Sequence, residues 1–172
     1  MARVQKIVPC LWFDEQAEQA VNFYVAIFEK DSRVTRVSHY TGEGQTIHGR
    51  EPGSVMTVEF ELAGVSLTAL NGGPHFKFNE AVSLQVMCEN QAEIDRYWSR
   101  LAEGGDVSAQ QCGWLKDQFG VSWQIVPAIL PELLSDPDVQ KASRVMRAIL
   151  QMKKLDLAEL KRAHGGRTEH AD

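Results

Sequence analysis

Cysteine is scarce in this sequence, and its few cysteines are not paired by spacing. Only Cys10, Cys88 and Cys112 occur in 172 residues, and no Cys-x-x-Cys motif is present. An odd, sparse set of thiols does not build a disulfide framework and is typical of a reducing compartment. We therefore expect a cytoplasmic protein, long enough to fold around an apolar core without a cross-link or a structural metal.

Long apolar runs and basic runs are missing as well. No segment approaches the roughly 20 apolar residues that a membrane helix requires. The first apolar run is interrupted by Pro9 and is too short for a signal peptide. The net charge is −5, and no Lys/Arg cluster is long enough to follow a phosphate backbone. We therefore expect neither a membrane nor a nucleic acid as partner.

The first half of the chain reads as one strand, one helix and three more strands. Residues 7–13 form a short apolar run typical of a strand. Asp14 is a candidate N-cap for a helix whose apolar residues recur at helical spacing from Ala17 to Phe28. Alternating patterns then predict strands at residues 32–40, 55–62 and 65–70, with a glycine-rich loop at 41–53.

The second half repeats this plan after the breaker Asn71-Gly72-Gly73-Pro74. Residues 81–87 predict a strand, and Asn90 with Glu93 predicts a capped helix. Three further strands are expected at residues 106–111, 113–116 and 121–126.

Beyond Pro127 the pattern becomes helical. Ser135-Asp136-Pro137 is expected to cap and open an amphipathic helix, and Asp156 to cap a shorter last one. The apolar side of the amphipathic helix includes Val145, Met146, Ile149 and Met152.

An internal repeat supports these assignments. Residues 14–18 (DEQAE) recur as residues 89–93 (ENQAE), and residues 64–70 (GVSLTAL) recur as residues 120–126 (GVSWQIV). The matching starts and ends predict an α+β fold of two tandem βαβββ modules, with curved mixed sheets enclosing a pocket, plus C-terminal helices. We expect a single domain, 1–172, with module one at 5–71, module two at 80–127 and a helical extension at 128–166.

Four motifs resemble one protein family. The run Ala20-Val21-Asn22-Phe23-Tyr24, after a strand and an Asp, is similar to the opening of the vicinal-oxygen-chelate superfamily of glyoxalases, bleomycin-resistance proteins and extradiol dioxygenases. Residues 71–81, 113–117 and 119–123 resemble its PhnB-like branch, many of whose members are labelled 3-demethylubiquinone-9 3-methyltransferase. The likeness extends to residues 152–156.

The resemblance implies where a metal would bind. In metal-using members, four side chains from the first and last strands of the modules hold the ion. Here those positions fall on Val8, Thr68, Ser83 and Gln124. Tight divalent sites use imidazole, carboxylate or thiolate groups, which none of these residues has. We therefore expect a metal-independent protein, and we expect Cys10 to be a buried core residue and not a ligand.

The methyltransferase label would require a site for S-adenosylmethionine. Such a site usually rests on a glycine-rich turn after the first strand of a parallel sheet. Here the first strand runs into Asp14-Glu15-Gln16, without glycine. We therefore expect no cofactor.

The remaining candidates for ligand binding are polar or aromatic residues on the expected strands and at the module junction. They are Gln124, Thr68, Ser83, Gln85, Trp12, Trp114 and His75. Each has a structural alternative: a satisfied buried amide, a core aromatic or a turn histidine. Trp123 should face away from Gln124, because side chains alternate along a strand. Lys116 and Asp117 are expected to set a turn.

Two classes of function follow from these residues and the resemblance. The first is a binding protein for a small apolar or aromatic molecule in the sheet cavity. The alternative is a metal-free enzyme of the same fold (isomerase, lyase or group transfer), and the sequence leaves open whether any reaction is catalysed. The resemblance also implies a homodimer, whose interface the amphipathic C-terminal helix could cover; the alternative is that this helix packs on its own sheet.

Overall fold

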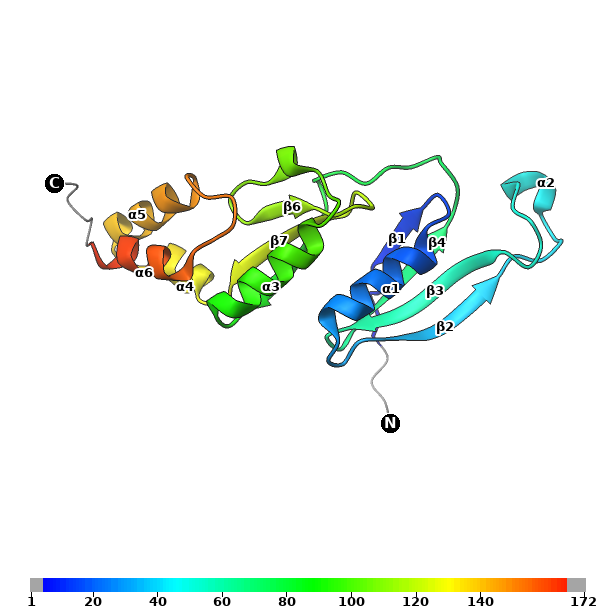
Figure 1. The fold of residues 1–172 in the computed structure, drawn as a ribbon, viewed down its shortest axis with the longest axis horizontal. Coiled ribbons are helices and arrows are strands. Elements are labelled where there is room, and N and C mark those ends of the chain that lie inside the picture. Colours follow the sequence, from blue (N-terminus) through cyan, green and yellow to red (C-terminus); the bar gives the residue numbers. More distant parts are fainter. Residues whose placement is uncertain (1–4, 167–172) are drawn as a thin grey trace. The chain divides into compact units, whose positions relative to one another are not determined.

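The computed structural model describes residues 5–166, which form two compact units that divide between Phe78 and Asn79 (Figure 1). The first unit is a four-stranded sheet with a helix packed on one face. Its elements are β1 (Cys10–Phe13), α1 (Ala17–Phe28), β2 (Arg33–His39), α2 (Gln45–His48), β3 (Val55–Leu62) and β4 (Val65–Asn71). The strand order is β1-β4-β3-β2, with β1 parallel to β4 and the other pairs antiparallel.

Alternation along the strands separates the two faces of this sheet. In β3, Val58 and Phe60 are buried beneath α1, whereas the intervening Glu59 is half-buried on the opposite face. α1 buries Ala20 and Tyr24 completely against the sheet. The expected strands and helix are therefore confirmed, although β1 begins at residue 10 and not at residue 7.

The start of α1 corrects the predicted cap. Asp14 does not cap the helix; Gln16 stands at the N-cap and makes no side-chain cap bond. Instead, the Ala17 amide donates to Asn71 Oδ1 at 2.9 Å, and Asn71 Nδ2 donates to the Val55 carbonyl at 3.1 Å. Asn71 reaches the helix because the parallel pairing of β1 and β4 sets Asn71 beside Phe13.

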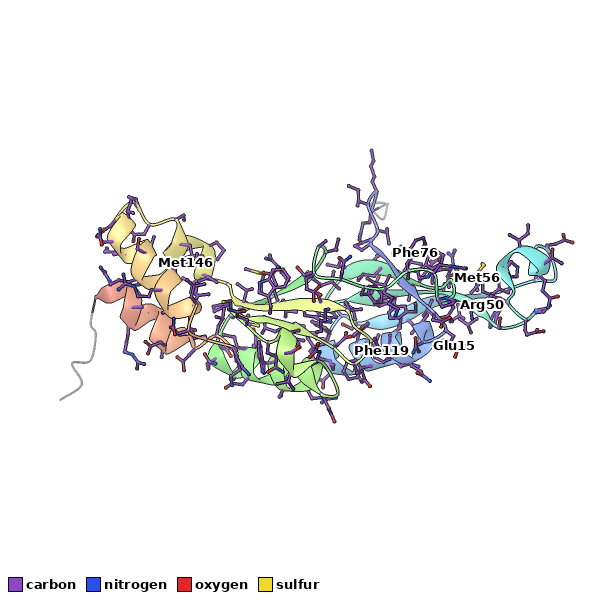
Figure 2. The ribbon with its side chains drawn as sticks, turned by 90° about the horizontal axis from the view of Figure 1, so that it is seen from above. Glu15, Arg50, Met56, Phe76, Phe119 and Met146 are labelled. Carbon is purple, nitrogen blue, oxygen red and sulfur yellow. The ribbon has the colours of Figure 1, made fainter. Side chains whose placement is uncertain are left out.

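Trp12 explains why two glycines follow Asn71. A Cβ on Gly72 would lie 2.2 Å from the Trp12 ring, so only glycine fits there. Gly73 has φ +97°, and its carbonyl accepts a 2.9 Å hydrogen bond from Trp12 Nε1. Phe76 packs edge-on against the same ring, with centroids 4.9 Å apart. Arg50, which is labelled in Figure 2, binds the main chain and carboxylate of Asp14.

The second unit contains a three-stranded sheet covered on one face by a helix. Its first elements are β5 (Leu84–Cys88), α3 (Gln91–Ala102), a 3₁₀ turn η1 (Val107–Ala109), β6 (Trp114–Lys116) and β7 (Ser122–Pro127). The order is β5-β7-β6, with β5 parallel and β6 antiparallel to β7. The predicted capping of α3 is confirmed: Asn90 Oδ1 accepts from the Glu93 amide at 3.0 Å.

The strand predicted at residues 106–111 is wrong. Residues 107–109 form η1, and Gln111 makes only an isolated bridge to Trp114. The reason is local, because the Asp106 carboxylate accepts from both the amide and the hydroxyl of Ser108, at 2.8 and 2.6 Å. Such a side chain–backbone turn competes with a strand ladder. The second module is therefore βαββ, not βαβββ.

Three helices follow: α4 (Leu130–Leu134), α5 (Val139–Ile149) and α6 (Leu157–Gly165). The sequence did not predict α4, and Ser135 ends it instead of opening the next helix. α5 is capped by Asp138, whereas Asp156 caps α6 as expected, accepting from the Glu159 amide at 2.8 Å.

These helices share a core with the end of β7. The buried cluster consists of Val126, Leu130, Leu133, Val145, Ile149, Leu155 and Leu160. Two side chains expected at a dimer interface, Val145 and Ile149, are therefore buried inside their own unit. Met146, labelled in Figure 2, remains exposed on α5. Among the described residues, no helix is both long and apolar enough to cross a membrane.

Asn71→Ala should be far more destabilising than Asn90→Ala. The first change leaves the Ala17 amide and the Val55 carbonyl without their side-chain partner, and we expect a loss of about 3 kcal/mol in unfolding free energy. The second removes one exposed cap and should cost about 1 kcal/mol. Urea denaturation followed by circular dichroism measures both, and equal losses would show that Asn71 does not tie α1 to the sheet.

Candidate functional site

The strand pairings place the two repeat positions in corresponding rows on the faces opposite the helices. In the first unit, Thr68 pairs with Cys10 and with Glu59. In the second unit, Gln124 pairs with Gln85 and with Trp114. Each row therefore has the last strand of its module in the middle, and Thr68 and Gln124, which the internal repeat made equivalent, occupy matching places in it.

Gln124 is the centre of a small polar network. Its Nε2 donates to Ser83 Oγ at 2.8 Å, and its Oε1 accepts from Gln85 Nε2 at 3.1 Å. The structure thus brings together three of the predicted site residues, Ser83, Gln85 and Gln124, with Trp114 in the neighbouring strand. Both ends of the Gln124 amide already have protein partners, so a ligand is not needed to satisfy it.

Trp123 lies on the other face, as alternation predicted. It is 2% exposed beneath α3, and its Nε1 donates to Asp117 Oδ2 at 2.8 Å. Asp117 Oδ1 also accepts from the amides of Phe119 and Val121. Asp117 therefore sets the turn before β7, and it holds Trp123 in the core as well.

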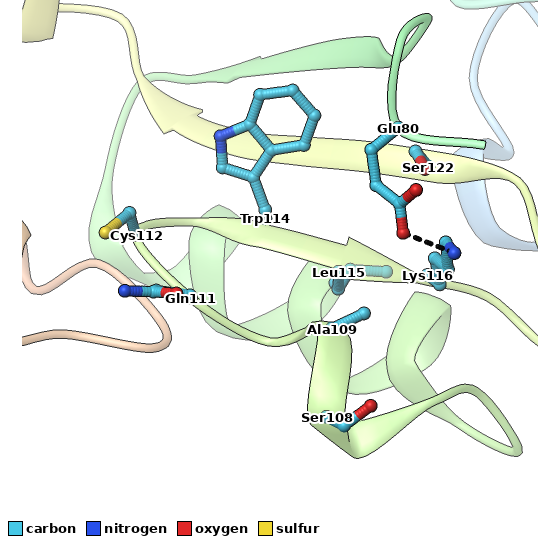
Figure 3. A pocket seen from close by; sticks show the side chains of 9 residues that line it. All are labelled: Glu80, Ser108, Ala109, Gln111, Cys112, Trp114, Leu115, Lys116 and Ser122. Atoms are coloured by element: carbon cyan, nitrogen blue, oxygen red, sulfur yellow. Dashed lines mark ion pairs between the residues drawn. The ribbon is translucent and has the colours of Figure 1, made fainter.

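An open hollow of about 430 Å³ lies beside β6, one of the two edge strands of this sheet; we call it the β6 hollow (Figure 3). Trp114 and Lys116 line it from β6, and Glu80, Cys112 and Ser122 line it from neighbouring segments. Sequence reasoning assigned Lys116 only to a turn and missed Glu80 and Cys112. The available signal was alternation, because residues 114 and 116 share one face of a strand.

Hydrogen bonds and burial shift the pKa values of several ionisable groups in the second unit. Lys116 Nζ forms an ion pair with Glu80, drawn as the dashed line in Figure 3. The hydrogen bond from Lys116 holds the pKa of Glu80 below its usual range. Hydrogen bonds from Ser108 likewise lower the pKa of Asp106. Burial raises the pKa of the Cys88 thiol to about 12, which makes it unreactive.

The predicted site residues of the first unit differ in burial and in their contacts. Trp12 is a packing residue, held by the Gly73 carbonyl and by Phe76. His75 is exposed in the segment after β4, and Thr68 is half-buried on the open face. The expectation that Cys10 is a core residue is wrong; it is exposed, because it opens β1 on the face that α1 does not cover.

The side chains at the four positions implied for a metal do not suit a metal ion. Val8 lies before β1 and is exposed, and Thr68, Ser83 and Gln124 offer only hydroxyl and amide oxygens. Within residues 5–166, no three His, Cys, Asp or Glu side chains are grouped closely enough to share an ion.

Two backbone hydrogen bonds join Cys112, which lines the β6 hollow, and its neighbour Gly113 to the segment between α5 and α6. We call residues 112 and 113 the rim of the hollow. The Cys112 amide donates to the Met152 carbonyl at 2.8 Å, and the Gly113 amide donates to the Lys153 carbonyl at 2.7 Å. Leu155 packs so closely on Gly113 that a Cβ there would lie 3.0 Å from Leu155 Cδ1. The segment between α5 and α6 therefore fixes where Cys112 stands.

The two related sheets, each with a helix on one face, have the fold expected from the resemblance to the vicinal-oxygen-chelate superfamily. A protein-family model described as 3-demethylubiquinone-9 3-methyltransferase matches residues 5–126, and the chain belongs to this PhnB-like family. The match ends at residue 126, so the likeness expected at residues 152–156 lies outside it.

Solved structures agree with this assignment. The PhnB protein of Bacillus cereus is 34% identical, with a TM-score of 0.62, over 72% of this chain and 100% of its own. Protein PA1353 of Pseudomonas aeruginosa (20% identity, TM-score 0.53, 72% of this chain and 98% of its own) shares the fold. So does the fosfomycin resistance protein FosX of Listeria monocytogenes (14%, TM-score 0.50, 78% and 99%). No curated protein matches the chain.

Gly113→Ala and Gly120→Ala form a matched pair that tests the rim. Both glycines have a positive φ, +86° and +85°, but only Gly113 has neighbours that a Cβ would meet. We expect Gly120→Ala to cost about 1 kcal/mol of stability from backbone strain, and Gly113→Ala about 2 to 3 kcal/mol.

Only Gly113→Ala should also speed labelling of the Cys112 thiol, measured after Cys10→Ser has removed the exposed cysteine. Equal stability losses with unchanged labelling rates would show that the C-terminal helices do not hold the rim.

Proposed function

We propose that this protein binds a small, mainly aromatic or apolar molecule at the β6 edge of its second sheet, without a bound metal ion. The observation that carries the proposal is the β6 hollow beside Trp114. Ligand sites are typically concave and largely apolar, with a few convergent polar groups. Here one indole, half-buried on β6, stands near the amide of Gln124, the Ser122 hydroxyl and the Lys116 ammonium.

Trp114 suits the role of a ligand platform better than the other tryptophans of the strands do. Trp123 is buried and bonded to Asp117, and half-buried Trp12 already donates to the Gly73 carbonyl and packs against Phe76. Trp114 is partly exposed and lines the hollow. An aromatic ring presented in this way binds planar apolar molecules through its face or edge.

Side-chain chemistry supports metal-independent binding. The positions at which metal-using relatives of this fold place ligands carry no imidazole, carboxylate or thiolate here, and hydroxyl and amide oxygens cannot supply the missing charge. A site of this composition holds an organic molecule by contact area and hydrogen bonds.

A second candidate is a metal-free enzyme, and the name of the matched family favours group transfer. The residues give this alternative less support. The turn from β1 to α1 contains Asp14, Glu15 and Gln16 and no glycine that would let a phosphate or sulfonium cofactor approach the backbone.

Trp114→Leu should weaken binding of the neutral probe 2-naphthamide by on the order of tenfold, because aromatic contact contributes about 1 to 1.5 kcal/mol. Chemical-shift titration measures the dissociation constant. Trp98→Leu is the control, since half-buried Trp98 lies on α3, across the sheet from Trp114. Binding that survives Trp114→Leu, or that falls equally in both variants, would place the ligand elsewhere.

Purified protein should carry far less than one zinc, nickel, iron or manganese ion per chain by elemental analysis. The reason is the donor set Val8, Thr68, Ser83 and Gln124, which lacks any strong ligand. Gln124→Leu serves as the reference variant. One metal ion per chain that disappears in Gln124→Leu would overturn metal independence.

A further inference from the structure

Lys116 and Trp114 form a pair of recognition groups within the β6 hollow. They are two residues apart on β6, so their side chains leave the same face about 7 Å apart. Lys116 is 23% exposed, and it pairs with Ser122 of β7, so the strand ladder fixes its base. An aromatic surface and a cation at this separation match a fused aromatic ring that carries an acidic group.

The ion pair with Glu80 shows that Lys116 can bind a carboxylate. The Glu80 side chain enters the hollow from the turn before β5 and bonds Lys116 Nζ, yet 58% of it remains exposed (Figure 3). The hydrogen bond from Lys116 lowers the pKa of Glu80, as expected for a carboxylate that accepts from an ammonium group. An ion pair this open to water contributes little free energy, so a competing anion can replace Glu80 without a large loss.

We propose that the β6 hollow selects aromatic molecules bearing a negatively charged group, with the ring against Trp114 and the anion on Lys116 in place of Glu80. Glu80 then acts as an internal counter-ion that neutralises Lys116 when no ligand is bound. This inference rests on the proposed function, because it assumes that Trp114 contacts a ligand.

The test compares 2-naphthoate with its neutral isostere 2-naphthamide on the full chain. For the unaltered protein we expect naphthoate to bind about threefold more tightly than naphthamide. Glu80→Gln should strengthen naphthoate binding by a further factor of about three and leave naphthamide unchanged. Lys116→Gln should abolish the preference. Glu132→Gln, which removes one exposed charge from α4, is the control and should change neither affinity.

The possible outcomes separate the two proposals. If both probes bind equally in all four proteins and binding still depends on Trp114, the charge selection is wrong and the proposed function stands. If neither probe binds the unaltered protein, both proposals fail. If Glu132→Gln strengthens naphthoate binding as much as Glu80→Gln does, the effect comes from net charge and Glu80 is not the displaced group.

Discussion

Each sheet packs one face against the helix of its own module, α1 or α3, and this constraint decides which residues can meet a ligand. Side chains alternate along a strand, so every residue beneath α1 or α3 fixes its two neighbours on the open face. Burial of Trp123 under α3 thus puts Gln124 in the open row, and burial of Leu115 does the same for Trp114 and Lys116. The residues that pack beneath the helix therefore also determine which residues lie on the open face.

The two related sheets have diverged on their open faces. In the first unit, cross-strand pairs occupy that face: Arg33 with Glu61 at 2.8 Å and Arg36 with Glu59 at 3.5 Å. Such pairs satisfy each other and leave little for a ligand to bind. In the second unit, the residue that corresponds to Glu59 is Trp114. The duplication therefore retained the ladder in both units, with a glutamate of β3 in one and a tryptophan of β6 in the other at the corresponding position.

Patterns with a fixed period were predictable from the sequence, whereas contacts between distant residues were not. The period of two gave the strands and the opposite orientations of Trp123 and Gln124, and the Asn90 capping box gave the start of α3. The cap of α1 escaped prediction because Asn71 lies 54 residues from Ala17. The ion pair of Glu80 with Lys116 likewise joins segments whose approach depends on the completed sheet.

The C-terminal helices hold residues at the border of the β6 hollow, although they lie outside the matched fold. The family model ends at residue 126, so α4, α5 and α6 are additions to the matched fold. They bury their own apolar cluster against Val126 and fasten Cys112 and Gly113 by two backbone hydrogen bonds. Residues 112 and 113 both have positive φ, a conformation that needs surrounding contacts to persist for a residue such as Cys112. Because Cys112 lines the β6 hollow, the added helices contribute to the shape of that hollow without supplying any of the side chains that line it.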